Sequence, residues 1–328
     1  MKAVVIKEYG GPEVLEVREV PEPVPEPGEL LVRVRAAGLN RGELLQRMGV
    51  YPQPGPRFDD EVPGLEFTGE VAAVTEGAEG FAEGDRVMGI VTGRGQAEYV
   101  TTHASLAVKV PEELSWTEAA AVPESFITAN DGLKQCRCSE GETVLVHAVG
   151  SGVGLAAVQV ARLHGAHTVL ATARSADKLE RAAEFDLDGA INTEEEDFAE
   201  RVAELTGKRG ADVIVDLVGA AFLAGNVKAA APKGRIVTIG LLGGVKAELN
   251  LAVAVAKRLE LRGTVLRSRS LEEKAHATRS FAERVLPALA AGKVVPVIDS
   301  VYPIEEVAEA HQRMEANANF GKIVLEIG

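Results

Sequence analysis

Residues 142–163 read ETVLVHAVGSGVGLAAVQVARL, and this stretch decides the fold class. An apolar run at Thr143–Ala148 predicts a strand, the glycines after it predict a tight turn, and Leu155–Leu163 has helical spacing that ends at Gly165. A strand, glycine-rich turn and helix in this order bind the pyrophosphate of a dinucleotide, because backbone N–H groups can approach it closely. The literal G-x-G-x-x-G spacing is absent, so a βα turn without a ligand stays the alternative. The turn residues expected to contact a dinucleotide are Ser151, Gly152 and Val153.

The end of the next strand indicates which dinucleotide is bound. Enzymes that use NAD carry an Asp or Glu about 20 residues past the glycines, where it binds the ribose 2′-hydroxyl. Here Thr168–Ala173 is followed by Arg174, Ser175 and Lys178. Two cations and a hydroxyl suit the 2′-phosphate of NADPH, and Ser175 is also expected to cap the next helix. We expect Asp177 to point away along that helix; a solvated helix start is the alternative.

The rest of the chain indicates two domains. Short apolar runs alternate with helical patterns in the middle of the chain, which predicts an α/β fold with a doubly wound parallel (Rossmann) sheet. The amino-terminal part has short β-branched runs between Gly and Pro turns, which indicates a barrel of antiparallel strands. Strand-like runs at Val294–Val301 and Lys322–Glu326 are expected to return and complete that barrel. The predicted domains are 1–122 with 267–328, and 123–266.

Composition excludes several classes of protein. The 328 residues carry a net charge of −14, which argues against a nucleic-acid surface. The nearly uncharged Thr143–Ala161 contains three glycines and splits into strand, turn and helix, so we reject a transmembrane reading. Cys136 and Cys138, one residue apart, match no disulfide framework or paired zinc motif and are expected to be reduced thiols. With no targeting segment apparent, a cytoplasmic location is the expectation.

Several motifs spread along the chain carry a family resemblance. They are AGLNR at 37–41, PGLEFTG at 63–69, GDRV at 84–87, the turn at 147–154 and GKIVL at 321–325. Together they resemble the quinone oxidoreductase (zeta-crystallin-like) family, a zinc-free branch of the medium-chain dehydrogenase/reductase superfamily. The Met48–Pro56 loop, Arg267–Arg269 and Met314–Asn317 look most like its stress-inducible quinone oxidoreductase subgroup. The resemblance implies a GroES-like β-barrel catalytic domain beside the Rossmann domain, with the active site in the cleft between them.

The comparison with zinc-dependent members of the superfamily bears on the chemistry. Those enzymes have a Cys ligand where this chain has Asn40, and a His ligand where it has Leu65. Leu65 cannot bind a metal, so the resemblance implies that there is no zinc site. Without a metal to polarise an oxygen, hydride transfer suits acceptors that conjugation already makes electron-poor, such as quinones and enones.

The resemblance also implies roles for individual residues. Asn40 is expected to border the nicotinamide and the acceptor oxygen. Tyr51 is expected either to donate a hydrogen bond or proton to that oxygen, or to anchor its proline-rich loop. A family Tyr at the adenine end is replaced by Thr193, which leaves that contact open. The further cofactor contacts implied are Thr128 at the nicotinamide ribose, Gly240, Leu241 and Leu242 at the carboxamide, and Arg267 and Asn317 closing over the site.

Three functions are compatible with this sequence. The favoured one is NADPH-dependent reduction of quinones. The second is reduction of α,β-unsaturated aldehydes or ketones, which differs only in the shape of the acceptor pocket. The third is a largely non-catalytic NADPH-binding role of the crystallin or RNA-binding kind, against which the acidic charge argues. A homodimer formed through edge strands of the cofactor domains is expected by resemblance.

Overall fold

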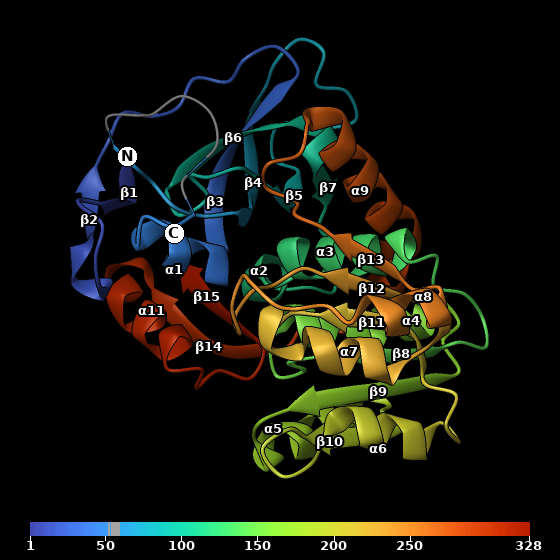
Figure 1. The fold of residues 1–328 in the computed structure, drawn as a ribbon. Helices are drawn as coiled ribbons and strands as arrows, with labels where there is room; N and C mark the ends of the chain where they lie inside the picture. The colour runs from blue at the N-terminus through green and yellow to red at the C-terminus, as the bar shows by residue number, and fades with distance from the viewer. Residues whose placement is uncertain (52, 54–59) are drawn as a thin grey trace. The chain divides into compact units, whose positions relative to one another are not determined.

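The computed structural model describes residues 1–51, 53 and 60–328, and its contacts divide the chain into two units (Figure 1). The first unit comprises Met1–Ile127 and Leu266–Gly328, and the second comprises Thr128–Val265. Residues 52 and 54–56 of the Met48–Pro56 loop, whose likeness to the stress-inducible subgroup was noted, lie outside the described residues. None of the helices in the described part of the chain combines the length and apolar character that a bilayer span requires.

The second unit is built on a wholly parallel sheet in the order β10-β9-β8-β11-β12-β13. Counted from its first strand this order is 3-2-1-4-5-6, which confirms the doubly wound class predicted from the sequence. The strand order reverses at β8, and the glycine-rich turn follows the carboxyl end of that strand. The strands are β8 (Thr143–Val146), β9 (Thr168–Ala173), β10 (Gly189–Asn192), β11 (Ala211–Asp216), β12 (Ala230–Thr238) and β13 (Glu260–Gly263).

Helices cover both faces of this sheet. On one face, Leu145 and Ile214 of the strands form a buried cluster with Val202 and Val227 of two helices. On the other face, Val237 lies against α3 (Pro123–Gln135), which begins in the first unit and continues into the second. The other helices are α4 (Gly152–Leu163), α5 (Ala176–Ala182), α6 (Phe198–Leu205), α7 (Leu223–Ala229) and α8 (Leu251–Lys257).

The first unit is built on a mainly antiparallel sheet. Within the described residues its order is β14-β15-β3-β4-β5-β7, with β6 also pairing to β3, and β1 and β2 form a separate hairpin. The return of the carboxyl-terminal strands to this sheet, predicted from the sequence, is observed. Its strands are β1 (Lys2–Ile6), β2 (Leu15–Glu19), β3 (Glu29–Leu39), β4 (Glu66–Val74), β5 (Arg86–Ile90), β6 (Tyr99–His103), β7 (Ala107–Lys109), β14 (Ile298–Pro303) and β15 (Lys322–Glu326).

The helices of the first unit cover the ends and one flank of its sheet. Residues 271–290 form two helices rather than one, because Pro287 lacks the N–H that a continuous helix would need and instead lies in the first turn of the second helix. The helices are α1 (Arg41–Arg47), α2 (Trp116–Ala120), α9 (Leu271–Arg284), α10 (Leu286–Ala290) and α11 (Val307–Glu315).

The two cysteines are buried and unpaired, as expected from their spacing. Both follow α3 in the second unit. Burial raises the pKa of the Cys136 thiol to about 11 and that of Cys138 to about 12.

Candidate functional site

The glycine-rich turn is held by hydrogen bonds that its own residues make. The Ser151 hydroxyl donates to the Ala148 carbonyl (2.8 Å) and accepts the Gly154 N–H (3.0 Å), so Ser151 caps α4. Ala148 has the left-handed φ of 52°, which reverses the chain directly after β8. A Cβ on Gly154 would lie 2.5 Å from the Ala148 oxygen, so this position requires glycine. The turn therefore presents the N-terminus of α4, starting at Gly152 and Val153, in a fixed conformation.

The predicted 2′-phosphate residues flank this turn. The aliphatic stem of Lys178 packs over Gly150, where an added Cβ would lie 2.7 Å from Lys178 Cδ. Arg174 is exposed at the end of β9. Asp177 lies 4.0 Å from Arg181, its partner one turn along α5, in agreement with the expectation that it points away. Lys178 thus lies against the turn, and Arg174 is exposed at the end of the neighbouring strand; their roles toward a 2′-phosphate stay predictions.

One expectation for this segment is wrong. Ser175 occupies the N-cap position of α5, but its side chain makes no capping hydrogen bond. Its backbone carbonyl accepts the Leu179 N–H (3.2 Å), the first hydrogen bond of the helix, which forms whether or not the N-cap side chain takes part. The Ser175 hydroxyl is therefore not committed to capping.

Other predicted cofactor positions of the second unit fit a dinucleotide. The Thr128 hydroxyl is buried and has no hydrogen-bond partner among the described residues, a costly state unless a ligand supplies one. A Cβ on Gly240 would collide with the Leu217 carbonyl, so the chain passes there without a side chain. Leu241 and Leu242 follow as exposed apolar side chains. The unpartnered hydroxyl is compatible with a bound ligand, and the roles of these residues toward a cofactor stay predictions.

His147, at the start of the turn, is a packing residue. It is fully buried, its ring packs edge-on against both Phe198 and Phe222, and its nitrogens lie 2.9 Å from Thr172 Oγ1 and 2.7 Å from Asn226 Oδ1. Burial lowers the pKa of His147 to about 4, although the hydrogen bond to Asn226 opposes this shift, so the ring is neutral at physiological pH. Both ring nitrogens are engaged within the protein, in agreement with a packing role.

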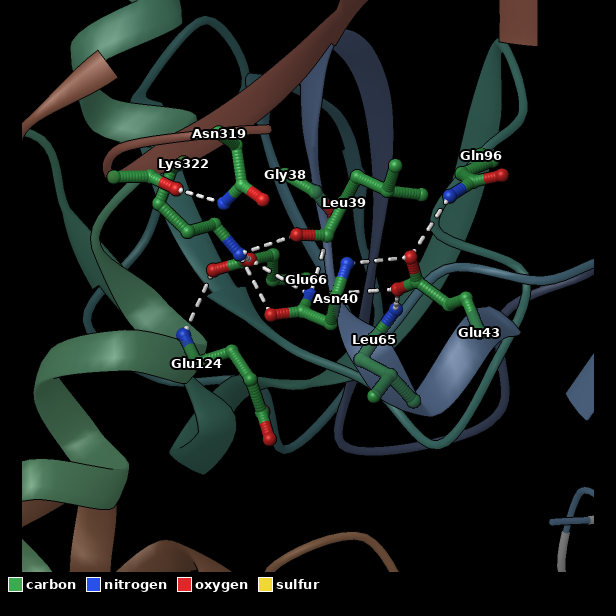
Figure 2. A network of polar contacts seen from close by, with 11 residues as sticks. Gly38, Leu39, Asn40, Glu43, Leu65, Glu66, Gln96, Glu124, Asn319 and Lys322 are labelled. Carbon is green, nitrogen blue, oxygen red and sulfur yellow. Dashed lines mark hydrogen bonds and ion pairs between the residues drawn. The ribbon is translucent and has the colours of Figure 1, made fainter. Parts of the chain in front are cut away.

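In the first unit, Asn40 belongs to a buried polar network (Figure 2). The Asn40 amide donates to Glu66 Oε1 (2.9 Å), and its Oδ1 accepts from the Lys322 ammonium (2.6 Å). Lys322 also donates to Glu66 Oε1 (2.5 Å) and to the Leu39 carbonyl (2.8 Å). Glu66 and Lys322 are both almost completely buried. The ammonium ion joins Asn40 and Glu66 at the centre of the network.

Glu43 closes the network on the side of α1. Its carboxylate accepts the backbone N–H groups of Asn40 (2.8 Å) and Leu65 (2.9 Å) and the Gln96 amide (3.1 Å). Burial raises the pKa of Glu43 to about 7, while the Asn40 N–H, Lys322 and the Leu65 N–H act to lower it. These donors fix Leu65 and Asn40 in place.

The residues at the positions of zinc ligands thus serve other purposes. Leu65 is buried, and only its backbone N–H contributes to the network. Asn40 is engaged by Lys322, whose positive charge would repel a metal ion placed at the same point. Among the described residues, no group of three or more His, Cys, Asp or Glu side chains could hold a metal.

Tyr51 is positioned by Arg267. The guanidinium lies over the Tyr51 ring, 5.0 Å from its centroid, and donates to the Tyr51 carbonyl (3.1 Å), the Thr92 carbonyl (2.8 Å) and Gln46 Oε1 (2.6 Å). Burial raises the pKa of the Tyr51 phenol, Arg267 lowers it and Glu124 raises it further. Arg267, predicted to contact the cofactor, is itself buried and holds this loop.

Asn317 is placed by an arginine of α1. Its Oδ1 accepts from Arg41 (2.7 Å), which also donates to the Met314 carbonyl (3.0 Å), and Asn317 itself has a left-handed φ of 54°. The roles predicted for Asn317 and Arg267 toward a cofactor stay predictions.

Sequence reasoning missed the charged residues that surround Asn40. Glu66 and Lys322 lie inside the PGLEFTG and GKIVL motifs, but they were noted only as parts of a resemblance. Glu43 and Glu124 carry no motif of their own. The sequence did contain a signal, because Glu66 and Lys322 each lie in an otherwise apolar strand. Charged side chains in such positions are seldom buried without a partner, so the two could have been expected to pair.

Two family models match the chain. One, described as an alcohol dehydrogenase GroES-like domain, matches residues 26–112, and the other, described as a zinc-binding dehydrogenase, matches residues 152–283. The quinone oxidoreductase of Lama guanicoe is 33% identical over 99% of this chain and 97% of its own length. The expected GroES-like and Rossmann architecture is therefore confirmed.

Solved structures of similar proteins cover the whole chain. A protein described as an NAD-dependent alcohol dehydrogenase is 37% identical, with a TM-score of 0.88 and full coverage of both chains. A mycobacterial protein complexed with NADPH is 31% identical, with a TM-score of 0.88 over 99% of this chain and 100% of its own. An enoyl reductase is 27% identical, with a TM-score of 0.88 over 100% of this chain and 99% of its own.

Proposed function

Because the chain belongs to the medium-chain dehydrogenase/reductase superfamily, with full-length relatives among quinone oxidoreductases, we propose that it reduces quinones with NADPH and without zinc. The network of Asn40, Glu66 and Lys322 carries this proposal. The Asn40 side chain is committed to Glu66 and Lys322, and the Leu65 side chain, at the other position where zinc enzymes carry a ligand, has no donor atom for a metal. The acceptor must then be electron-poor by its own structure, because no Lewis acid polarises it.

The choice of NADPH rests on the residues beside the turn. The similar structures include one described with NADPH and one described as NAD-dependent, so likeness does not decide between the two cofactors. Arg174 follows β9 and the stem of Lys178 packs over the turn, and this supports their assignment to the 2′-phosphate of the adenosine ribose. When bound, the nicotinamide supplies the hydride. Thr128 would hold its ribose and Ser151, Gly152 and Val153 its pyrophosphate.

The remaining side chains would orient the acceptor. Asn40 has its amide and carbonyl fixed by Glu66 and Lys322, so it presents a rigid edge to the reacting groups. Tyr51 is held by Arg267, and burial raises the pKa of its phenol. It is suited to donate a hydrogen bond to the acceptor oxygen.

Turnover assays test this function. Purified protein should oxidise NADPH in the presence of small quinones, and a zinc chelator should leave the rate unchanged. Absence of activity with every quinone in a panel would contradict quinone reduction. Activity confined to a panel of enones would instead support the second candidate, reduction of conjugated aldehydes and ketones, which the likeness to an enoyl reductase favours. NADPH binding without turnover of either panel would indicate a non-catalytic role.

A further inference from the structure

Glu124 contacts the network of Asn40, Glu66 and Lys322 through its backbone, and its carboxyl group takes no part in that network. Its backbone N–H donates to Glu66 Oε2 (2.8 Å), which places the start of α3 beside Asn40 and Lys322. Figure 2 shows the side chain pointing away from the network. No described residue donates a hydrogen bond to the Glu124 carboxyl group, which is partly exposed. A carboxyl group so placed is available to another molecule.

The surroundings of Glu124 favour its protonated form. Burial, together with the nearby charges of Glu66 and Glu43, raises the pKa of Glu124 to about 8. Lys322 and Arg267 act in the opposite direction. Most of the molecules therefore hold a proton on Glu124 at neutral pH, although carboxyl groups ordinarily lose theirs near pH 4. The charged or titratable groups facing it are Glu43 on α1, Tyr51, Glu66 on β4, Arg267, Lys274 on α9 and Lys322 on β15.

Glu124 also lies close to the residues expected at the reaction centre. Its charge raises the pKa of the Tyr51 phenol, so the two groups are within electrostatic range of each other. Its N–H contacts Glu66, which accepts from the Asn40 amide. Thr128, expected at the nicotinamide ribose, follows one turn later on the same helix and therefore on the same helix face.

We propose that Glu124 supplies the proton that the reduction consumes, an inference that rests on the proposed function. Hydride transfer brings two electrons and one hydrogen to the acceptor and oxidises the nicotinamide. The acceptor oxygen then forms a bond to the proton of the Glu124 carboxyl group, and the Glu124 O–H bond breaks. The resulting carboxylate takes a proton from solvent, to which the side chain has access, so one proton from water is consumed in each cycle.

The pH dependence of kcat tests this role. Because the protonated form is the active one, wild-type kcat should fall as pH rises through about 8. Glu124→Gln cannot donate a proton, so its kcat at neutral pH should fall by about 100-fold, a typical contribution of a general acid. The fall of kcat near pH 8 should also disappear in this variant. Glu124→Asp should keep the fall of kcat at high pH. Glu113→Gln, the same substitution at an exposed position, is the control and should behave as wild type. A Glu124→Gln variant with unchanged kcat and an unchanged fall of kcat near pH 8 would overturn the proposal.

Two further measurements separate this role from a structural one. The loss in Glu124→Gln should grow with the basicity of the oxygen in the reduced acceptor, whereas a packing defect would affect all acceptors alike. In the cofactor-free protein, difference infrared spectra should show a protonated carboxyl band that disappears near pH 8 and is missing in Glu124→Gln. Titration of that band near pH 4 would overturn the proposal.

The two proposals fail in different ways. A wild-type protein that reduces no conjugated acceptor overturns the proposed function and this role with it. An active wild type matched by Glu124→Gln at every pH overturns this role alone.

Discussion

At the scale of single residues, the two cations beside the turn should set the choice of cofactor. Replacing Arg174 and Lys178 by Ala should weaken NADPH binding by roughly 1–3 kcal/mol for each charge-assisted contact and leave NADH binding nearly unchanged. Fluorescence titration with both cofactors measures this. Arg181→Ala, which removes an exposed cation from the same helix, is the matched control. Equal losses for NADPH and NADH would contradict the 2′-phosphate assignment.

Lys322 should be required for stability as well as for the site. Lys322→Met leaves the buried Glu66 carboxylate without its ammonium partner, which should cost about 3–5 kcal/mol in the free energy of unfolding. The double variant with Glu66→Gln removes both charges and should recover most of that loss. Chemical denaturation compares the three proteins. A single variant as stable as wild type would show that the ion pair contributes little.

At the scale of elements, two glycines of the turn should respond differently to the same added methyl group. Gly154→Ala places its Cβ against backbone, so the turn must rearrange and the affinities for NADPH and NADH should both fall by about tenfold or more. Gly150→Ala meets only the flexible stem of Lys178, which can move aside. Gly150→Ala should therefore weaken the binding of NADPH but not that of NADH. The pair serves as its own control, and identical effects would contradict this account of the turn.

The elements that sequence predicted well are those with a strong local pattern. The bounds of β9 and β15 match the predicted runs, and the glycine-rich turn lies between a strand and a helix as predicted. The edge strand β10 was not predicted, because four residues are too few for a periodic signal. The pairing of Glu66 with Lys322 joins residues 256 positions apart, and hydrophobic periodicity carries no information about such contacts. Asn40 was therefore placed by resemblance, and its partners became known only from the structure.

At the scale of the whole molecule, one surface of the second unit predicts self-association. The strand β13 is the edge of its sheet among the described residues, and α8 beside it exposes Leu251 and Val255 by 67% and 73%, one helical turn apart. The expected homodimer would cover this apolar surface. Leu251→Lys with Val255→Lys should give a monomer in analytical ultracentrifugation. Val24→Lys, at an 84% exposed position of the other unit, should not change the sedimentation, and an unaltered dimer in the double variant would refute this interface.

The buried cysteines have a consequence for the durability of such an enzyme. Quinones and enones are electrophiles that alkylate thiolates, and a thiol reacts only to the extent that it ionises. Cys136 and Cys138 are the only cysteines of the chain, and their raised pKa values keep both protonated at physiological pH. Their burial also keeps dissolved acceptors away from the sulfur atoms. The two thiols would therefore resist alkylation by the quinones and enones that are proposed as acceptors.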